Sequence, residues 1–340
     1  MTKAASARYL NDRMPMIASI RASALIPLVR ELDQRSGKAD LLLAAQGIFR
    51  TQLDDPYTTI PIDGYLAAFE QAADIVGDPC LGARLGTALK PADIGPMGML
   101  FAMAPTIRRA FERISRFVSA LQSATSSEVA EKAGTLVWSY GVNDPALWPR
   151  RQDSEYTLAA TCHLVRQCFV ADWKPIEVHF EHSAPSDPKP LRRLFQAPVR
   201  FGQSANRLIF DAAGADRVHH QEDPALVEML QRHIADLSGE LGMPGTYSER
   251  VEALLGIRLG FKDVTMTSLA KELGMAPRTL QRRLAEEGVS LRELLRRYRI
   301  SMTASYERTN ERNRSRLAHA LGYADSTSLW RARRQWKAEG

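Results

Sequence analysis

The stretch Met266–Ala285 reads MTSLAKELGMAPRTLQRRLA and decides how the C-terminal part of the chain folds. Two short helices that cross tightly need a small residue at the crossing, a turn residue tolerant of positive φ four positions later, and an apolar anchor on the second helix. Ala270, Gly274 and Leu280 meet these demands at positions 5, 9 and 15 of the stretch. The spacing therefore predicts a helix-turn-helix, with Pro277 opening the second helix, where its missing N–H costs nothing.

The outward face of the second predicted helix carries side chains suited to nucleic acid. Because Leu280 and Leu284 face inward, helical spacing turns the polar residues around them outward. An arginine can bind the O6 and N7 atoms of guanine, and a glutamine the N6 and N7 atoms of adenine, while a threonine can bind phosphate. The candidate DNA contacts here are Arg278, Thr279, Gln281 and Arg282. The alternative is a helical hairpin whose arginine-rich face is only solvated.

The positive charge of the chain is concentrated in the same region. The whole sequence of 340 residues has a formal net charge of +6. From Pro277 onward there are 15 basic and 7 acidic residues, a net charge of +8, which leaves −2 on the other 276 residues. Arginine forks suit phosphate oxygens and guanine edges, so this excess predicts a polyanionic partner. The alternative is again a solvated basic face.

Composition sets the broad class of the protein. Hydrophobic residues make up 45% and charged residues 25% of the sequence, as in ordinary globular proteins, and the length suggests two domains. Charges interrupt the N-terminus and no run of 18 apolar residues occurs, so we expect neither a leader nor a membrane span. Three scattered cysteines, Cys80, Cys162 and Cys168, favour a reducing cytoplasm over a disulfide framework.

The residues before the helix-turn-helix predict a mixed domain. Apolar positions at helical spacing indicate helices over 61–76, 106–121 and about 153–171. Alternating or β-branched segments indicate strands over 135–142, 176–182 and 207–212. We therefore predict an α+β domain over 1–237, a linker over 238–246 (SGELGMPGT) and an all-α domain over 247–340.

A second unit follows in the C-terminal part, LAHALGYADSTSLWRARRQW over 317–336. Together, the two units resemble the DNA-binding domain of the AraC/XylS family, which has two helix-turn-helix units joined by a long helix, here 292–308. The resemblance implies that a second recognition helix also contacts DNA. Its outward candidates are Ser326, Thr327, Trp330, Arg331 and Arg334, the last two as phosphate contacts. The unit departs from the family pattern at Arg314, Leu329 and Arg333.

The N-terminal part is similar to the arabinose-binding-like domain that precedes such DNA-binding domains. The matching text is GDPCLGARLG (77–86), IGPMGMLFAMAPTIRRAFERISRF (94–117), PIEVHFEHSAPSD (175–187) and APVRFGQSANRLIFD (197–211). The resemblance implies a transcription regulator, expected to be an activator that responds to a small-molecule effector. It also implies double-stranded promoter DNA and RNA polymerase as partners, a homodimer, and a place in the cytoplasm at the nucleoid.

An effector pocket needs aromatic walls with a few polar groups. Trp138 and Tyr140 alternate on one predicted strand, and Arg151 could hold a carboxylate. The candidate effector residues are Trp138, Tyr140, Trp148, Arg151, Tyr156 and His163. The alternative is that the aromatic residues belong to the core and that the arginine is solvated.

Other functions remain open from the sequence. No CxxC, HExxH, GxSxG or P-loop pattern occurs, so we expect no enzyme, no metal site and no cofactor. One alternative is a DNA-repair enzyme with an AraC-like module and a reactive cysteine. Another is an interaction protein whose imperfect second helix-turn-helix no longer binds DNA.

Overall fold

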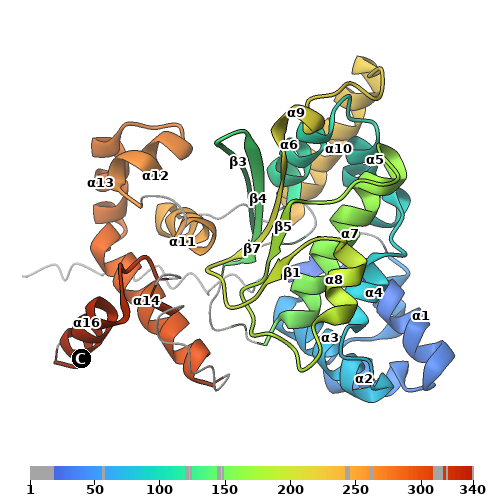
Figure 1. The fold of residues 1–340 in the computed structure, drawn as a ribbon, viewed down its shortest axis with the longest axis horizontal. Helices are drawn as coiled ribbons and strands as arrows, with labels where there is room; N and C mark the ends of the chain where they lie inside the picture. Colours follow the sequence, from blue (N-terminus) through green and yellow to red (C-terminus); the bar gives the residue numbers. More distant parts are fainter. Residues whose placement is uncertain are drawn as a thin grey trace, which may run out of the picture.

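A computed structural model describes residues 19–55, 58–118, 122, 125–143, 147, 149–241, 246–259, 264–308, 317–318 and 321–338. The chain up to Leu241 forms an α+β part built on a five-stranded sheet, and the helices after it lie beside one edge of that sheet (Figure 1). Buried apolar side chains form two separate clusters, one between Ile20 and Ile234 and one between Val251 and Leu329. The architecture is therefore an α+β part followed by a mostly helical part.

The sheet has the strand order β3-β4-β7-β5-β6. Its strands are β3 (Thr125–Lys132), β4 (Thr135–Val142), β7 (Asn206–Asp211), β5 (Glu177–His179) and β6 (Val199–Arg200). All neighbours are antiparallel except β5 and β6, which are parallel. A small second sheet pairs β1 (Ser19–Arg21) with β2 (Thr59–Pro61).

The sequence predicted three strands of the five-stranded sheet and missed β3 and β6, as well as the short strands β1 and β2. β4 has the predicted bounds, and β5 and β7 lie inside or overlap the predicted segments. β3 reads TSSEVAEK, with a mostly polar, half-exposed pattern. It is an edge strand held by its ladder with β4, so its own residues carry little apolar alternation.

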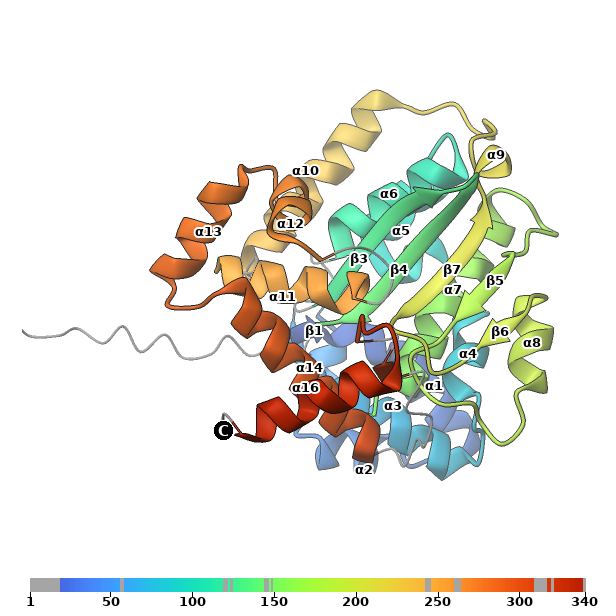
Figure 2. The ribbon, with the colours of Figure 1, turned by 60° about the vertical axis from the view of Figure 1, so that its left-hand side comes forward.

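Helices cover the sheet and build the rest of the α+β part. They are η1 (Ala22–Leu25), α1 (Ile26–Arg35), α2 (Ala39–Ala45), η2 (Arg50–Leu53), α3 (Ile62–Val76), α4 (Leu81–Gly86), η3 (Pro91–Ile94), α5 (Gly95–Ala102), α6 (Ile107–Phe117), α7 (Arg151–Cys168), α8 (Lys189–Phe195), α9 (Ala212–Ala215) and α10 (Pro224–Leu241). In Figures 1 and 2, α5, α6 and α7 lie on one side of the sheet.

Helices α4 and α7 touch backbone to backbone. An ideal Cβ built on Gly82 would lie 2.0 Å from the carbonyl oxygen of Gln152, and one on Gly86 would lie 2.5 Å from the carbonyl oxygen of Tyr156. The backbone N–H of Gly82 donates to the side-chain oxygen of Gln152 at 2.8 Å. These glycines bring α4 against α7, the helix that carries much of the site described below.

The C-terminal part contains α11 (Tyr247–Arg258), α12 (Met266–Glu272), α13 (Pro277–Glu286), α14 (Leu291–Arg308) and α16 (Ser326–Ala338). Figures 1 and 2 place α14 between the α12–α13 pair and α16, and α11 beside the sheet. Helix α10 runs to Leu241, so the first residues of the predicted linker 238–246 are helical, and residues 242–245 lie outside the described part. No helix among the described residues is long and apolar enough to cross a membrane.

Candidate functional site

Helices α12 and α13 pack through the residues that their spacing singled out. Leu269, Ala270, Leu280 and Leu284 are all buried. Gly274 has φ of +65° in the turn between the helices, a conformation that side chains with a Cβ disfavour. Pro277 is the first residue of α13, as predicted. The two helices therefore meet at a fixed angle with one apolar side and one polar side.

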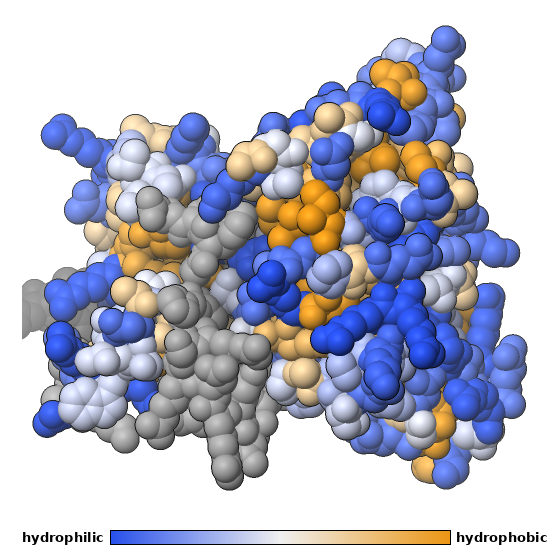
Figure 3. Space-filling view, viewed as in Figure 1, coloured by the Kyte–Doolittle hydropathy of each residue, from blue (hydrophilic) through white to orange (hydrophobic). Residues whose placement is uncertain are grey.

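The polar side of α13 is open to solvent. Arg278, Gln281 and Arg282 are exposed and Thr279 is half-buried. Arg282 forms an ion pair at 3.6 Å with Glu286 on the same helix, an exposed contact that is worth little and easily exchanged. Hydrophilic residues project from the outer edge of the α12–α13 pair (Figure 3). All four predicted residues are thus close together on an accessible helix.

The second set of predicted DNA contacts lies on α16. Ser326, Thr327, Arg331 and Arg334 are exposed, and so is Trp330, at 54%. The Arg334 guanidinium lies 4.9 Å from the centroid of the Trp330 ring, a cation–π distance that keeps both at the surface. These five side chains lie in the N-terminal part of α16, just as the four predicted contacts on α13 lie in the N-terminal part of that helix.

The structure describes two of the three residues at which this unit departs from the family pattern. Leu329 is buried with Leu321, so it occupies a core position. Arg333 is half-buried, and Trp336 packs partly against the same core. The guanidinium of Arg299 on α14 lies 4.5 Å from the centroid of the Tyr323 ring, and its Nε donates to the Leu321 carbonyl at 3.0 Å. Arg314 lies outside the described residues.

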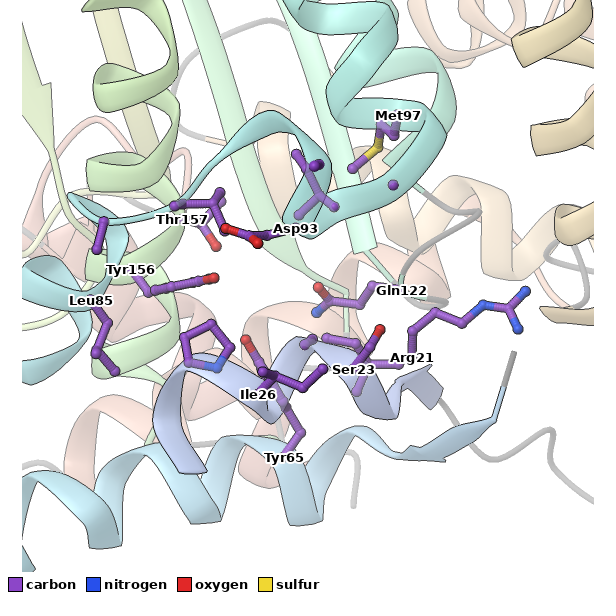
Figure 4. Close-up of a pocket in the computed structure, with 18 of the residues that line it drawn as sticks. Arg21, Ser23, Ile26, Tyr65, Leu85, Asp93, Met97, Gln122, Tyr156 and Thr157 are labelled. Atoms are coloured by element: carbon purple, nitrogen blue, oxygen red, sulfur yellow. The ribbon is translucent and has the colours of Figure 1, made fainter. Parts of the chain in front are cut away.

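A cavity of about 610 Å³ opens in the α+β part, a size suited to a small organic molecule. Its wall combines residues of η1, α1, α3, α4, η3, α5, α7 and α10. Most of this wall is aliphatic, including Ile26, Leu85, Leu89, Ile94, Met97 and Ile234. Figure 4 shows the polar side chains Tyr65, Asp93, Gln122, Tyr156 and Thr157 around the same space.

A buried carboxyl lies at the inner wall of this cavity. Asp153 is 1% exposed, and the Tyr140 hydroxyl donates to its Oδ2 at 2.9 Å. Burial raises the pKa of Asp153 to about 6, although the hydroxyls of Tyr140 and Tyr65 and the charge of Arg150 oppose this shift. A second buried carboxyl, Glu181, has its pKa lowered: burial would raise it, but the charge and hydrogen bonds of Arg150 outweigh burial.

The predicted effector residues are not all brought together. Tyr156 lines the cavity. Tyr140 is not among the lining residues, but its hydroxyl donates to Asp153, which is. Trp138 is core: its indole N–H donates to Ser127 Oγ at 2.7 Å.

The remaining predicted effector residues lie elsewhere. Arg151 pairs with Glu155 at 2.7 Å and donates to the Pro79 carbonyl at 2.6 Å, outside the cavity lining. His163 is half-buried and also outside the lining, and Trp148 lies outside the described residues.

The sequence did not predict five polar residues that line the cavity: Tyr65, Asp93, Gln122, Asp153 and Thr157. Tyr65 lies among the buried residues of the helix predicted over 61–76, and helical spacing cannot distinguish a core face from a cavity wall. The usable signal was the polar run QDSE at the start of a helix whose other faces are apolar. All four of these residues are buried, and buried polar groups mark ligand or structural networks.

The cysteines lie in surroundings that suppress thiolate formation. Burial raises the pKa of Cys162 to about 12 and that of Cys80 to about 11, and it also raises that of Cys168. A reactive cysteine needs the opposite shift, because the thiolate is the nucleophile. These shifts do not favour the alternative of a DNA-repair enzyme with a reactive cysteine.

The helical part is attached to the sheet through α11. Arg258, at the end of α11, forms ion pairs with Glu128 on β3 at 2.8 Å and with Glu272 on α12 at 2.7 Å. The Arg258 side chain is only 3% exposed. Farther along, Tyr298 on α14 lies close enough to Arg150 and Glu181 for their charges to affect its pKa, which burial raises. Helix α11 thus contacts the α+β part, and α14 lies within electrostatic range of it.

Comparison with known proteins gives a family match within the α+β part and similar regulators. The model of the arabinose-binding domain of AraC transcription regulators, N-terminal, matches residues 37–218. The chain is 27% identical to the HTH-type transcriptional regulator VirS of Mycobacterium tuberculosis over 80% of each chain. It is 24% identical to the ornithine utilization regulator of Pseudomonas aeruginosa over 96% of this chain and 95% of that one.

Among solved structures, the transcriptional regulator CdpR of Pseudomonas aeruginosa matches with a TM-score of 0.45 and 19% identity, covering 93% of this chain and 95% of that one.

Proposed function

We propose, from the premise that this chain belongs to the family of AraC-type transcription regulators with an N-terminal arabinose-binding-like domain, that it binds promoter DNA in a sequence-specific way and activates transcription in response to a small molecule. Helices α12–α13 act as the first helix-turn-helix, α14 as the joining helix and α16 as the recognition helix of the second. The effector occupies the cavity lined by Tyr65, Gln122 and Tyr156.

The observation that carries this proposal is the exposed face of α13. Arg278, Gln281 and Arg282 are exposed on the side opposite Leu280 and Leu284, which are buried. An arginine and a glutamine so placed present donors and acceptors that match guanine and adenine edges in the major groove. The net charge of +8 from Pro277 onward supplies the sequence-independent attraction to phosphate.

The contact between α11 and β3 offers a route from effector to DNA. A ligand shifts a regulator only if it binds one conformation more tightly than another. The ion pairs of Arg258 join the edge strand of the effector-binding part to α12, the first helix of the DNA-binding pair. A change at β3 is therefore passed to α12 through one buried guanidinium.

Other parts of the proposal follow from family membership. Paired half-sites lengthen the DNA sequence that is recognised, so we propose a homodimer on double-stranded promoter DNA. Activation requires contact with RNA polymerase, and both partners place the protein in the cytoplasm at the nucleoid.

DNase footprinting with the full-length protein tests the DNA function. The expected result is a protected segment in promoter DNA near its own gene, with protection that weakens as salt concentration rises. Absence of any protected segment, in low salt and with or without candidate effectors, would contradict the proposal. A reporter gene fused to the protected promoter then distinguishes activation from repression.

A further inference from the structure

The polar groups of the cavity wall select the charge of its ligand. The buried polar wall residues are Arg21, Tyr65, Gln122, Asp153 and Tyr156. Figure 4 shows Tyr65, Gln122 and Tyr156 around the inner space, whereas the Arg21 guanidinium points away from it. Among these buried wall residues, Asp153 is the one with a carboxyl, and it lines the cavity.

A second carboxyl, on an exposed residue of the wall, adds to the negative charge of the cavity. Asp93 lines the cavity and is exposed. Burial raises the pKa of Tyr156, and the charges of Asp93 and Asp153 raise it further, so both carboxyls lie within electrostatic range of its hydroxyl. The third lining carboxylate, Glu31, is neutralised by Arg84 at 2.6 Å and Arg35 at 3.4 Å.

The positively charged residues that line the cavity do not neutralise the negative charge at its inner end, where Asp153 lies. Arg30 and His233 are exposed residues at the outer part of the wall. Arg150, which lies within electrostatic range of Asp153, already forms a two-pronged ion pair with Glu181, with distances of 2.7 and 2.9 Å. The inner cavity is thus aliphatic and acidic.

Gln122 provides an independent sign that a ligand belongs here. Its side chain is buried, only 4% exposed, and its amide end points into the cavity (Figure 4). Its Nε2 has no hydrogen-bond partner among the described residues. A buried amide without a partner is unfavourable in proteins, so such groups are rarely left unmatched. A ligand with an acceptor atom would satisfy it.

We propose that the cavity binds an aliphatic amine, whose ammonium group lies between Asp153 and Asp93 and whose hydrocarbon body packs on the aliphatic wall. An additional acceptor atom on the natural ligand, such as a hydroxyl or carbonyl oxygen, pairs with Gln122. An ammonium is favoured because the carboxyls attract it in a site partly shielded from water, while they repel a carboxylate. This inference deepens the proposed function by naming the chemical class of the effector. It rests on that function only where it calls the bound amine an effector.

The test compares three probes of equal chain length, hexylamine, hexan-1-ol and hexanoate, on the full-length protein. Thermal unfolding and titration calorimetry measure binding, since a ligand that binds only the folded state raises Tm by an amount that grows with the logarithm of its concentration above Kd. The expected result is a concentration-dependent rise in Tm and measurable heat with hexylamine alone. Equal effects of hexan-1-ol, stronger effects of hexanoate, or no effect of hexylamine each overturn the proposal.

Variants place the binding in this cavity. Asp153→Asn keeps the size of the side chain and is expected to weaken hexylamine binding by about tenfold or more, the scale of a charged hydrogen bond. Asp93→Asn changes only an exposed carboxylate, so folding is preserved, and a two- to fivefold loss of about the size of an exposed ion pair is expected. Asp172→Asn, the same change at an exposed residue that does not line the cavity, is the matched control. Unchanged affinity in both Asp153→Asn and Asp93→Asn overturns the assignment.

A DNA mobility-shift assay run in parallel keeps the two proposals apart. DNA binding without any binding of hexylamine overturns the amine inference and leaves the regulator function standing. Binding of hexylamine that depends on Asp153, with no DNA binding under any condition, supports the amine site and contradicts the proposed function.

Discussion

Arg258 on α11 lies 2.8 Å from Glu128 on β3, with its side chain almost entirely buried. The pair has two prongs, because Arg258 Nε also donates to the second carboxylate oxygen at 3.0 Å. The same guanidinium contacts Glu272 on α12. One side chain therefore joins an edge strand of the α+β part to both helices that begin the C-terminal part.

Replacing Glu128 should loosen this attachment. We expect Glu128→Gln to lower the free energy of unfolding by about 1–3 kcal/mol, because it removes one charge partner from a buried guanidinium. Hydrogen exchange should rise along β3 and α11. Glu272→Gln is the matched control, since it removes the other partner without touching the sheet. Faster exchange of β3 in Glu272→Gln but not in Glu128→Gln would contradict this account.

The contact of α4 with α7 should not tolerate a single methyl group. Gly82→Ala places a Cβ 2.0 Å from the Gln152 carbonyl oxygen, and we expect a loss of about 3 kcal/mol or more in unfolding free energy as the helices separate. Gly64→Ala is the control, because its nearest neighbour lies at 3.5 Å. That variant should be neutral or more stable by up to about 1 kcal/mol, the gain in helix propensity. Chemical denaturation measures both, and equal effects would refute the packing argument.

The two helices proposed to recognise DNA should differ in what their arginines do. Arg282→Ala on α13 is expected to relax the preference for one base pair by about 1–3 kcal/mol. Arg331→Ala on α16 should weaken binding to all sequences alike and reduce the salt slope by about one. Arg232→Ala, an arginine with a 74% exposed side chain on α10, is the control. Competition binding against a library of sites at several salt concentrations checks this, and wild-type behaviour of both variants would show that these helix faces are misassigned.

The pH dependence of stability should carry the signature of Asp153. Its pKa in the folded protein is raised to about 6, with burial as the main cause, from an ordinary value of 3.8. The folded state then binds the proton more tightly than the unfolded state, so this group's contribution to stability falls as pH rises from about 4 to 6. Neighbouring Tyr65, Tyr140, Arg150 and Glu181 remain in place in Asp153→Asn.

We therefore expect the stability of Asp153→Asn, relative to the natural protein, to improve between pH 4.5 and pH 7. Denaturant unfolding of both proteins at the two pH values measures the difference. A relative stability that stays constant, or that falls toward pH 7, would show that the carboxyl ionises with its ordinary pKa.

The α12–α13 pair was predictable because its determinants are local. The small residue, the turn glycine and the apolar anchor lie within Ala270–Leu280, and helical periodicity alone decides which side chains of α13 face solvent. The strand β4 was predictable for the same reason, since β-branched and aromatic residues alternate along it. The concentration of arginine after Pro277 is likewise a property of the sequence.

The cavity was decided by tertiary structure alone. Tyr65, Asp93, Gln122 and Asp153 come from α3, η3, the segment before β3 and α7, and no spacing rule relates them. Trp138 and Tyr140 share a strand face, as the sequence predicted. Packing nevertheless buries Trp138 in the core, whereas the hydroxyl of Tyr140 donates to Asp153. Local sequence sets the conformation of a short segment because its determinants are a few bonds apart. Whether a buried side chain meets a neighbour or an open space depends on helices brought together from distant parts of the chain.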